Sequence, residues 1–206
     1  MHDGSFRAED WLVDTISQST TLDVVRRFHY AQGGSKTAAA RHGLFRRGNE
    51  LVCMGVAQWI PPTRHTAMAV WPHGDWRRVL ALSRFALDPS LNGNGAAASY
   101  LLGRAIRLIK QGGAWDCLVT YADPLQEHQG IIYRATNWTC TGPTEPERVW
   151  VDRHGAQVAR KAGGKTRTHA EMLARGHRFL GYHPKLRYVY PLVAHPDDWP
   201  ANVSTT

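Results

Sequence analysis

The sequence lacks several features that would place it in a class at once. No apolar run approaches the roughly 18 residues that a membrane-spanning helix needs. The first ten residues, MHDGSFRAED, contain three acids and no apolar stretch like that of a secretory signal, so we expect a cytoplasmic protein. The three cysteines, Cys53, Cys117 and Cys140, are an odd number without paired spacing, which disfavours a zinc site or a disulfide framework. We expect reduced thiols in the core or in loops.

The composition is that of a globular protein. Of the 206 residues, 43% are hydrophobic and 20% are charged, which excludes a disordered, collagen-like or coiled-coil chain. At roughly 100 to 200 residues per domain, this length favours one sizeable domain. We predict a single domain over residues 1–206, with a basic segment (residues 153–187) inserted before the terminal strand.

Positive charge is concentrated in that basic segment. The chain has 25 Lys and Arg against 17 Asp and Glu, a net charge of +8. The basic segment alone holds nine Lys and Arg and one acid, Glu171, so the remaining residues are balanced. Such a block is typical of a polyanion-binding surface, because each phosphate that Lys or Arg neutralises releases condensed counterions. A solvated, disordered loop around KAGGKTRTH is the alternative.

The order of expected elements is mixed α/β. Helical spacing of apolar residues in the first forty positions predicts two short helices there. Residues 42–47 and 51–60 flank Gly48-Asn49-Glu50 and predict a hairpin that Pro61 and Pro62 end. Later patterns predict strands at 79–87, 116–123 and 185–192 and after Asn137, and helices at 96–110, 124–136 and 168–175.

A glycine loop lies between the strand at 79–87 and the long helix. In Ser90-Leu91-Asn92-Gly93-Asn94-Gly95, two glycines precede a helix start, where unpaired N–H groups and the helix dipole favour a pyrophosphate. No Gly-Lys-Ser/Thr follows, and the spacing is not GxGxxG, which excludes a Walker loop and a dinucleotide fingerprint. Acyl-coenzyme A remains as the ligand, although a glycine turn before a helix can also be purely structural.

This loop resembles motif A of the GNAT acyltransferases, Gln/Arg-x-x-Gly-x-Gly/Ala, with Ser90 where that family has Gln or Arg. The resemblance implies a mixed, mostly antiparallel sheet with a splayed central strand pair flanked by helices. The following DCLVTYAD and LQEHQGIIYRATNW look like the second half of that fold. Tyr133 stands where a GNAT tyrosine protonates the departing thiolate, a general-acid role suited to a phenol. A core aromatic is the alternative for Tyr133.

The wider sequence resembles the Mom DNA-modification family of bacteriophages, a divergent GNAT branch. The shared motifs occur in the family's order: RFHYAQG, WIPPT, SRFAL, the glycine loop with Ser99 behind it, YADP, GIIYRATNW and GYHPKLRYVYPL. The resemblance implies modification of the exocyclic amine of adenine in double-stranded DNA, which protects phage DNA from host restriction. The implied mark is methylcarbamoyl, with acetyl-coenzyme A as donor. Simple acyl transfer would instead give acetyl-adenine.

The resemblance also implies the roles of individual residues. Tyr133, Asp123, His29 and Tyr30 are the expected catalytic residues. Imidazole, phenolate and carboxylate suit iron, which has been proposed for the family, and a redox metal would activate carbon. Without metal, Asp123 or His29 would act as the base for the adenine amine, or would orient Tyr30.

The expected donor site consists of Arg84, Asn92, Gly93, Gly95 and Ser99. Arg84 and Ser99 are expected to contact a phosphate or a carbonyl. A salt bridge for Arg84 and a hydrogen bond at the helix start for Ser99 are the structural alternatives.

An enzyme that acts on a base inside a duplex must extrude that base into an apolar or aromatic surface. We expect Trp59 and Trp138 to receive it, with the basic segment gripping the DNA backbone without reading sequence. The expected DNA-binding cations are Arg160, Lys161, Lys165, Arg167, Lys185 and Arg187.

Two other functions fit parts of the pattern. An ordinary GNAT N-acetyltransferase acting on a protein, RNA or small-molecule amine explains the glycine loop and Tyr133 equally well. A nucleic-acid-binding protein that kept this fold and lost catalysis explains the basic segment and the departure at Ser90.

Overall fold

The computed structural model describes residues 6–29, 33–91, 95–162 and 164–194. Seven strands form the main sheet, in the spatial order β1-β2-β3-β4-β5-β11-β6. In that order they are Trp11–Thr15, Ala40–Arg46, Asn49–Ile60, Val79–Leu87, Cys117–Ala122, Leu186–Pro191 and Thr139–Pro143. Neighbours pair antiparallel except β4 and β5, which pair in parallel. This is the mixed, mostly antiparallel sheet that the sequence predicts.

The central parallel pair is splayed. Strands β4 and β5 pair through Val79–Cys117, Leu80–Leu118 and Ala81–Val119, and no further pairing joins their described residues. Both strands nevertheless continue, β4 to Leu87 and β5 to Ala122. The ends of β4 and β5 therefore form a fork in the middle of the sheet.

A β-bulge lies in β4 at the point where the fork opens. Opposite β3, Trp59 pairs with Leu82 while Gln58 pairs with Arg84, so Ser83 is an extra residue in β4. In a regular strand, residues two apart point to the same face, and an inserted residue breaks that alternation. Leu82 accordingly packs in the core on one face of the sheet, whereas Arg84 shares the other face with Gln58.

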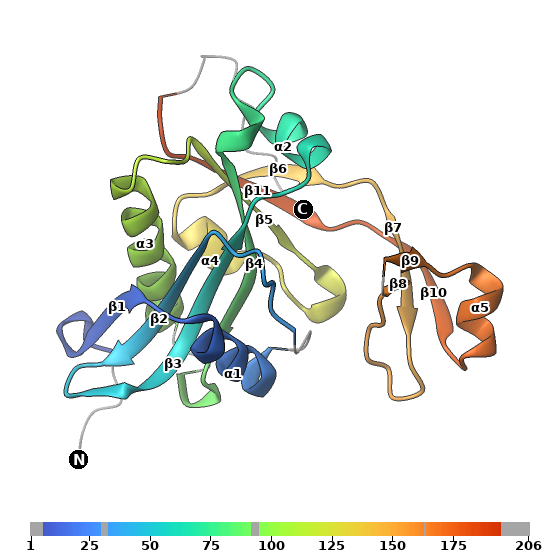
Figure 1. The fold of residues 1–206 in the computed structure, drawn as a ribbon, viewed down its shortest axis with the longest axis horizontal. Helices are drawn as coiled ribbons and strands as arrows, with labels where there is room; N and C mark the ends of the chain where they lie inside the picture. Colours follow the sequence, from blue (N-terminus) through green and yellow to red (C-terminus); the bar gives the residue numbers. More distant parts are fainter. Residues whose placement is uncertain (1–5, 30–32, 92–94, 163, 195–206) are drawn as a thin grey trace.

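Helices cover both faces of the main sheet (Figure 1). Adjacent residues of β3 point to opposite faces: Val56 packs in a cluster with Val24 and Val25 of α1, and Ala57 packs with Leu101 and other residues of α3. α1 (Gln18–Phe28) and α2 (Arg64–Val70) thus cover one face, and α3 (Gly95–Gln111) and α4 (Ile131–Ala135) cover the other.

The N-terminal prediction of two helices is wrong for its first part. Trp11–Thr15 is the edge strand β1, paired in register with β2, and only the second expected helix, α1, forms. A segment of only five residues fits both the helical period of 3.6 and the strand period of 2, and pairing with β2 makes this one a strand. The Trp11 ring is buried and stacks on Phe6, and Ser17 caps α1 by accepting a hydrogen bond from the Thr20 N–H at 3.1 Å.

The expected helix over residues 124–136 is interrupted. A 3₁₀ turn at Pro124–Gln126 is followed by a loop, and α4 begins only at Ile131. Glu127 and Gly130 both have positive φ, 58° and 71°, which ends helical continuity between them. A Cβ at Gly130 would overlap the Tyr188 ring, so this position requires glycine on two grounds.

The other predicted elements are confirmed. The hairpin forms as β2 and β3, β3 ends before Pro61, and β4, α3, β5, β6 and β11 occupy the expected positions. The three cysteines are buried thiols without a disulfide. In the part of the chain that the structure describes, no helix is long and apolar enough to span a bilayer.

Residues 147–183, here called the side unit, extend to one side of the main sheet (Figure 1). β7 (Glu147–Val151) pairs with β10 (Arg178–His183), β8 (Lys161–Ala162) pairs with β9 (Lys165–Thr166), and α5 (His169–Ala174) packs on β10. Trp150 is buried against the rings of His169 and Phe179, at centroid distances of 4.8 and 5.2 Å. The side unit therefore has its own small core, and the described residues of the basic segment include defined strands and a helix.

Candidate active site

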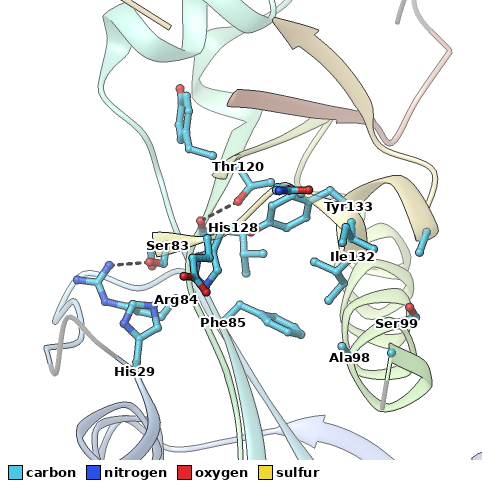
Figure 2. Close-up of a pocket in the computed structure, with 18 residues that line it drawn as sticks. His29, Ser83, Arg84, Phe85, Ala98, Ser99, Thr120, His128, Ile132 and Tyr133 are labelled. Atoms are coloured by element: carbon cyan, nitrogen blue, oxygen red, sulfur yellow. Dashed lines mark hydrogen bonds between the residues drawn. The ribbon is translucent and has the colours of Figure 1, made fainter. Parts of the chain in front are cut away.

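The fork between β4 and β5 holds a cavity of about 410 Å³, here called the fork cavity (Figure 2). Its walls come from both strands, from the first turns of α3, from α4 and from the loop before α4. The residues that line it are His29, Leu82–Phe85, Gly95, Ala98, Ser99, Thr120, Tyr121 and 127–133, together with Ala135. Because β4 and β5 do not pair here, the cavity lies between separated strands and is bordered by elements from both faces of the sheet.

The α3 wall contains two of the predicted donor residues. Gly95 is the first residue of α3 and lines the cavity, and a Cβ there would meet no atom of another described residue within 4 Å. Ser99 lies one turn further along and also lines the cavity. The first N–H groups of a helix lack intrahelical acceptors and carry the positive end of the helix dipole, which favours an anion. Asn92 and Gly93 lie outside the described residues.

Arg84 is held rigidly at the opposite wall. Its Nε donates a hydrogen bond to the Gly33 carbonyl at 2.6 Å, and its Nη1 donates to the Ser83 carbonyl at 2.6 Å. Ser83 in turn donates from Oγ to the Gln58 carbonyl at 3.0 Å, which fixes the bulge. No ion pair joins Arg84 to another described residue, so the salt-bridge alternative finds no partner there. The bulge therefore presents a fixed cation to the cavity.

Tyr133 lies on α4 with its half-buried ring at the cavity wall (Figure 2). The ring packs against Tyr188 and Trp138, at centroid distances of 5.1 and 5.8 Å. Tyr188 is itself fixed, because its hydroxyl donates to the Gln129 carbonyl at 3.1 Å and accepts from Arg134 Nη1 at 2.9 Å. The phenol is thus positioned by aromatic packing against two buried rings.

His29 faces the cavity as a neutral imidazole. Burial, followed by the positive charges of Arg84 and His128, lowers the pKa of His29 from 6.5 to about 4. Near neutral pH, His29 therefore carries no charge, and a neutral imidazole has one acceptor and one donor nitrogen. Tyr30, the expected partner of His29, lies outside the described residues.

Asp123 does not line the fork cavity. It is 6% exposed, and its Oδ1 accepts a hydrogen bond from the Leu125 N–H at 3.1 Å, which caps the turn after β5. Its Oδ2 accepts from Gln157 Nε2 at 3.4 Å. Its carbonyl accepts from the His128 N–H at 3.2 Å. Asp123 therefore fixes the loop that brings His128 to the fork cavity, and its carboxylate points into a second cavity.

This second cavity, here called the basic cavity, has a volume of about 810 Å³ and lies between the side unit and the main sheet. Five Arg and Lys side chains and two carboxylates line it. They are Arg84, Arg148, Arg160, Lys161 and Lys185, with Asp123 and Glu147. Arg84 lines both cavities, so the two cavities adjoin at the β4 bulge.

The predicted DNA-binding cations are divided between several environments. Arg160, Lys161 and Lys185 line the basic cavity, and Lys185 lies 3.5 Å from Glu147. Lys165 forms an ion pair with Glu171 at 2.9 Å and does not line the basic cavity. Arg167 donates to the Ala159 carbonyl at 3.3 Å across the β8–β9 hairpin, and Arg187 Nε donates to Thr141 Oγ1 at 2.7 Å on the main sheet.

The expectation that Trp59 and Trp138 receive an extruded base is wrong. Trp59 is 0% exposed and Trp138 is 2% exposed, and both belong to the core under α3. A ring without exposed surface cannot stack on an incoming base. In the sequence, Trp59 begins the WIPPT motif and Trp138 ends the GIIYRATNW motif. The alternation of side chains in β3 and the turn after α4 nevertheless point the two rings into the core.

The residues described here do not fit the expected iron. Among them, no group of three or more His, Cys, Asp and Glu lies close enough together to hold a metal ion. His29 lines the fork cavity and Asp123 the basic cavity, so those two expected ligands serve different spaces.

Several site residues have no distinctive signal in the sequence. His128 and Gln129 reach the fork cavity from the loop that interrupts the expected helix, and Arg148 and Gln157 reach the basic cavity from β7 and the segment after it. The glycine at position 130, directly before the tyrosine helix, is the one feature that could have indicated the break in that helix.

Solved structures with the same arrangement are GNAT acetyltransferases. The ribosomal-protein-S18-alanine N-acetyltransferase of Escherichia coli is 10% identical, with a TM-score of 0.52 over 91% of this chain and 97% of that one. A putative acetyltransferase of Salmonella typhimurium, solved with its cofactor acetyl-CoA, is 12% identical, with a TM-score of 0.52 over 91% and 98%. A GNAT family acetyltransferase of Elizabethkingia anophelis with acetyl-CoA bound is 10% identical, with a TM-score of 0.51 over 89% and 99%. At these identities the likeness shows the fold.

The comparison with curated proteins finds no match. The model of the Mom protein family matches residues 10–198, a span that includes both cavities and the whole side unit. The chain therefore belongs to the Mom protein family and has the GNAT fold.

Proposed function

We propose that this protein modifies the exocyclic amine of adenine in double-stranded DNA, with an acetyl-coenzyme A type donor bound in the fork cavity. The observation that carries the proposal is the pair of adjoining cavities: one at a helix start in a strand fork, the other with five Arg and Lys against two carboxylates in its lining, with Arg84 common to both. The first suits an acyl donor with a pyrophosphate, and the second suits a polyanionic acceptor. Membership of the Mom family supports this choice of acceptor.

The fork cavity is the proposed binding site for the acyl donor. Two of the solved structures named above hold acetyl-CoA on the same fold. By this analogy the pyrophosphate lies against the start of α3, near Gly95 and Ser99, and the pantetheine arm passes between β4 and β5. Arg84 supplies a fixed positive charge on the far side, where charge develops during transfer. Leu82, Phe85 and Ile132 give part of this cavity an apolar lining.

Tyr133 is the proposed general acid. Departure of coenzyme A leaves a thiolate, and a phenol within reach of the sulfur protonates it. Tyr133 lines the fork cavity and is fixed by the rings of Tyr188 and Trp138. Neutral His29 is the proposed acceptor for a proton of the adenine amine, whose lone pair is delocalised into the purine ring and therefore needs such help.

The acceptor side requires base extrusion, because the adenine amine is inaccessible inside a stacked duplex. The basic cavity adjoins the fork cavity at Arg84 and has room for a nucleotide. In cells, the proposed outcome is protection of phage DNA from host restriction endonucleases.

The expected mark is methylcarbamoyl. Attack of the amine on the thioester carbonyl would give N-acetyladenine, whereas the methylcarbamoyl mark joins the amine to the former methyl carbon. That product also needs an amide nitrogen from a second donor and a two-electron acceptor that takes up the electrons of the broken C–H bond, so both are further co-substrates of the proposed reaction. The mass of the modified nucleoside therefore distinguishes the two products.

The test is nucleoside mass spectrometry on plasmid DNA from cells that express the protein. We expect a modified deoxyadenosine with the wild type, and its loss by about a hundredfold or more with Tyr133→Phe, since a general acid typically contributes that much. Tyr100→Phe is the matched control: it removes a hydroxyl that donates to the Trp11 carbonyl at 2.8 Å, away from both cavities, and we expect it to keep the mark.

Unmodified DNA from cells containing folded wild-type protein that binds coenzyme A would contradict the proposal. It would instead favour an N-acetyltransferase acting on a protein, RNA or small-molecule amine, for which the fork cavity is equally suited. Modification that persists in Tyr133→Phe would overturn the role of the tyrosine alone. Duplex binding without donor binding would favour a nucleic-acid-binding protein that has lost catalysis.

A further inference from the structure

The basic cavity contains a polar pair that the donor chemistry does not use. Gln157 follows β7, and its backbone forms a bridge with Val151, so its position relative to that strand is fixed. Its side-chain Nε2 lies 3.4 Å from Oδ2 of Asp123, which is 6% exposed at the end of β5. Both residues line the basic cavity. The contact joins the side unit to the main sheet.

The chemistry of this pair determines how the Gln157 amide is oriented. Oδ2 of Asp123 accepts the hydrogen bond, so the amide turns its NH₂ group toward Asp123. One amide hydrogen is used by that contact. The second amide hydrogen and the Oε1 acceptor remain for a ligand, and together they present one donor beside one acceptor.

Adenine presents the complementary pattern. Its exocyclic N6 amine donates and its N7 accepts, and a Gln amide binds the two together. Hypoxanthine differs by carrying a carbonyl oxygen at C6. That oxygen would face Gln157 Oε1, an acceptor against an acceptor, so the same amide discriminates against hypoxanthine.

The cations around the pair are placed for a phosphate. Lys161 is exposed on β8, and its amine forms no ion pair with another described residue. Arg160, beside it, directs Nε and Nη2 to the Arg167 carbonyl at 3.1 and 2.8 Å, which stiffens the β8–β9 hairpin that carries Lys161. Lys161 is thus the cation of this lining that is least committed to the protein itself.

We infer that the basic cavity is the binding site for the acceptor nucleotide, in which Gln157, oriented by Asp123, reads the aminopurine edge and Lys161 binds a flanking phosphate. This inference rests on the proposed function and adds the residue that selects the base. Gln157 is a specificity-determining residue that acts by binding. Asp123 acts through it as a positioning residue, which explains why this carboxylate lies in the basic cavity and not in the fork cavity.

The test measures binding of the full-length protein to two duplexes by fluorescence anisotropy. In each duplex the central base lies opposite an abasic site, so that no base pair has to be broken before extrusion. One duplex carries adenine at that position and the other carries hypoxanthine, with the same mixed flanking sequences. We expect the wild type to bind the adenine duplex about tenfold more tightly, the discrimination that one bidentate contact gives.

Gln157→Met keeps the length of the side chain and removes the amide. We expect this variant to bind both duplexes with the weaker affinity, with an unchanged dependence on salt. Lys161→Ala should weaken both duplexes equally and lower the slope of log affinity against log salt by about one phosphate contact. Gln111→Met and Lys110→Ala, both at exposed positions late in α3, are the matched controls and should bind like the wild type.

The results that would contradict this inference differ for Gln157, for Lys161 and for the proposed function as a whole. Equal binding of the two duplexes by the wild type, or a tenfold preference that survives in Gln157→Met, overturns the role of Gln157 even if plasmid DNA is modified in cells. Lys161→Ala with an unchanged salt slope overturns the phosphate contact. Absence of duplex binding by the wild type, together with unmodified plasmid DNA, overturns both this inference and the proposed function. Thermal unfolding of each variant shows whether a loss of binding reflects a loss of fold.

Discussion

At the scale of single residues, burial lowers the pKa of His42, which lines neither the fork cavity nor the basic cavity. His42 lies on β2 with 4% of its surface exposed, and its Nδ1 has no hydrogen-bond partner among the described residues. Burial lowers its pKa from 6.5 to about 4, and the carboxylate of Asp14 partly opposes that shift. The folded protein therefore keeps His42 neutral under conditions in which the unfolded chain protonates it.

This histidine predicts a loss of stability in acid. Because the folded pKa is below the unfolded one, its contribution is fully present above about pH 6.5 and is lost as the pH falls toward about 4. Between about pH 8 and about pH 5, His42 should reduce the free energy of unfolding by about 2 kcal/mol. His42→Leu should remove that part of the pH dependence, measured by urea denaturation at both pH values. An unchanged pH dependence in the variant would contradict the assignment.

The residues of the fork could be predicted from the sequence better than those of the basic cavity. Arg84, Gly95, Ser99 and Tyr133 lie on regular elements whose period and order are visible in the sequence, and all four line one cavity. The burial of Trp59 and Trp138 could not be predicted from the sequence, because tryptophan suits both a core and a base-binding surface. Gln157 gave no signal, since a lone glutamine acquires meaning only when tertiary folding brings it to Asp123.

At the scale of elements, two local irregularities build the site. The extra residue Ser83 moves Arg84 to the face of the sheet opposite Leu82, and the break at Gly130 places α4 over the fork. Neither follows from hydrophobic periodicity, because a bulge and a positive φ interrupt that pattern. The strands and long helices were predictable, whereas the two features that aim side chains into the cavity depend on pairing partners distant in sequence.

Gly130 provides a test of that break. Gly130→Ala introduces both an unfavourable positive φ and an overlap with the Tyr188 ring, whereas Gly155→Ala, at a φ of 84°, meets no atom of the described residues within 4 Å. The φ penalty alone should cost Gly155→Ala about 1 kcal/mol of stability. Gly130→Ala should cost more, about 3 kcal/mol, because the overlap displaces α4 or the ring. Denaturant unfolding measures both, and equal losses would mean that Tyr188 does not constrain this turn.

At the scale of the whole molecule, two binding functions adjoin at one arginine. The fork cavity belongs to the main sheet, the basic cavity lies between that sheet and the side unit, and Arg84 lines both. The split in the charge distribution could be predicted from the sequence, because the basic segment stands out against a neutral remainder. How the side unit folds back to form a cavity could not, since it depends on the contact between Gln157 and Asp123 and on the pairing of β7 with β10.

This shared position predicts which variants affect which ligand. Arg84→Lys keeps the charge and loses the guanidinium geometry that bonds the Gly33 and Ser83 carbonyls, so affinity for both acetyl-coenzyme A and duplex DNA should fall by about tenfold. Lys161→Ala should lower only the affinity for the duplex. Titration calorimetry with acetyl-coenzyme A and fluorescence anisotropy with the duplex give the two affinities. A loss confined to one ligand in Arg84→Lys would show that the two cavities act independently.

The most direct measurement follows the donor's carbon into DNA. Purified protein would be incubated in air with unmodified plasmid, acetyl-coenzyme A labelled isotopically in its acetyl group, and a desalted extract of cells that lack the protein, supplemented with amide-nitrogen donors and two-electron acceptors. Mass spectrometry of the nucleosides should then find the label in a modified deoxyadenosine, and Tyr133→Phe should abolish it. A modified deoxyadenosine without label would contradict acetyl-coenzyme A as the carbon donor. Unmodified DNA, in the presence of protein that binds both ligands, would contradict adenine as the acceptor.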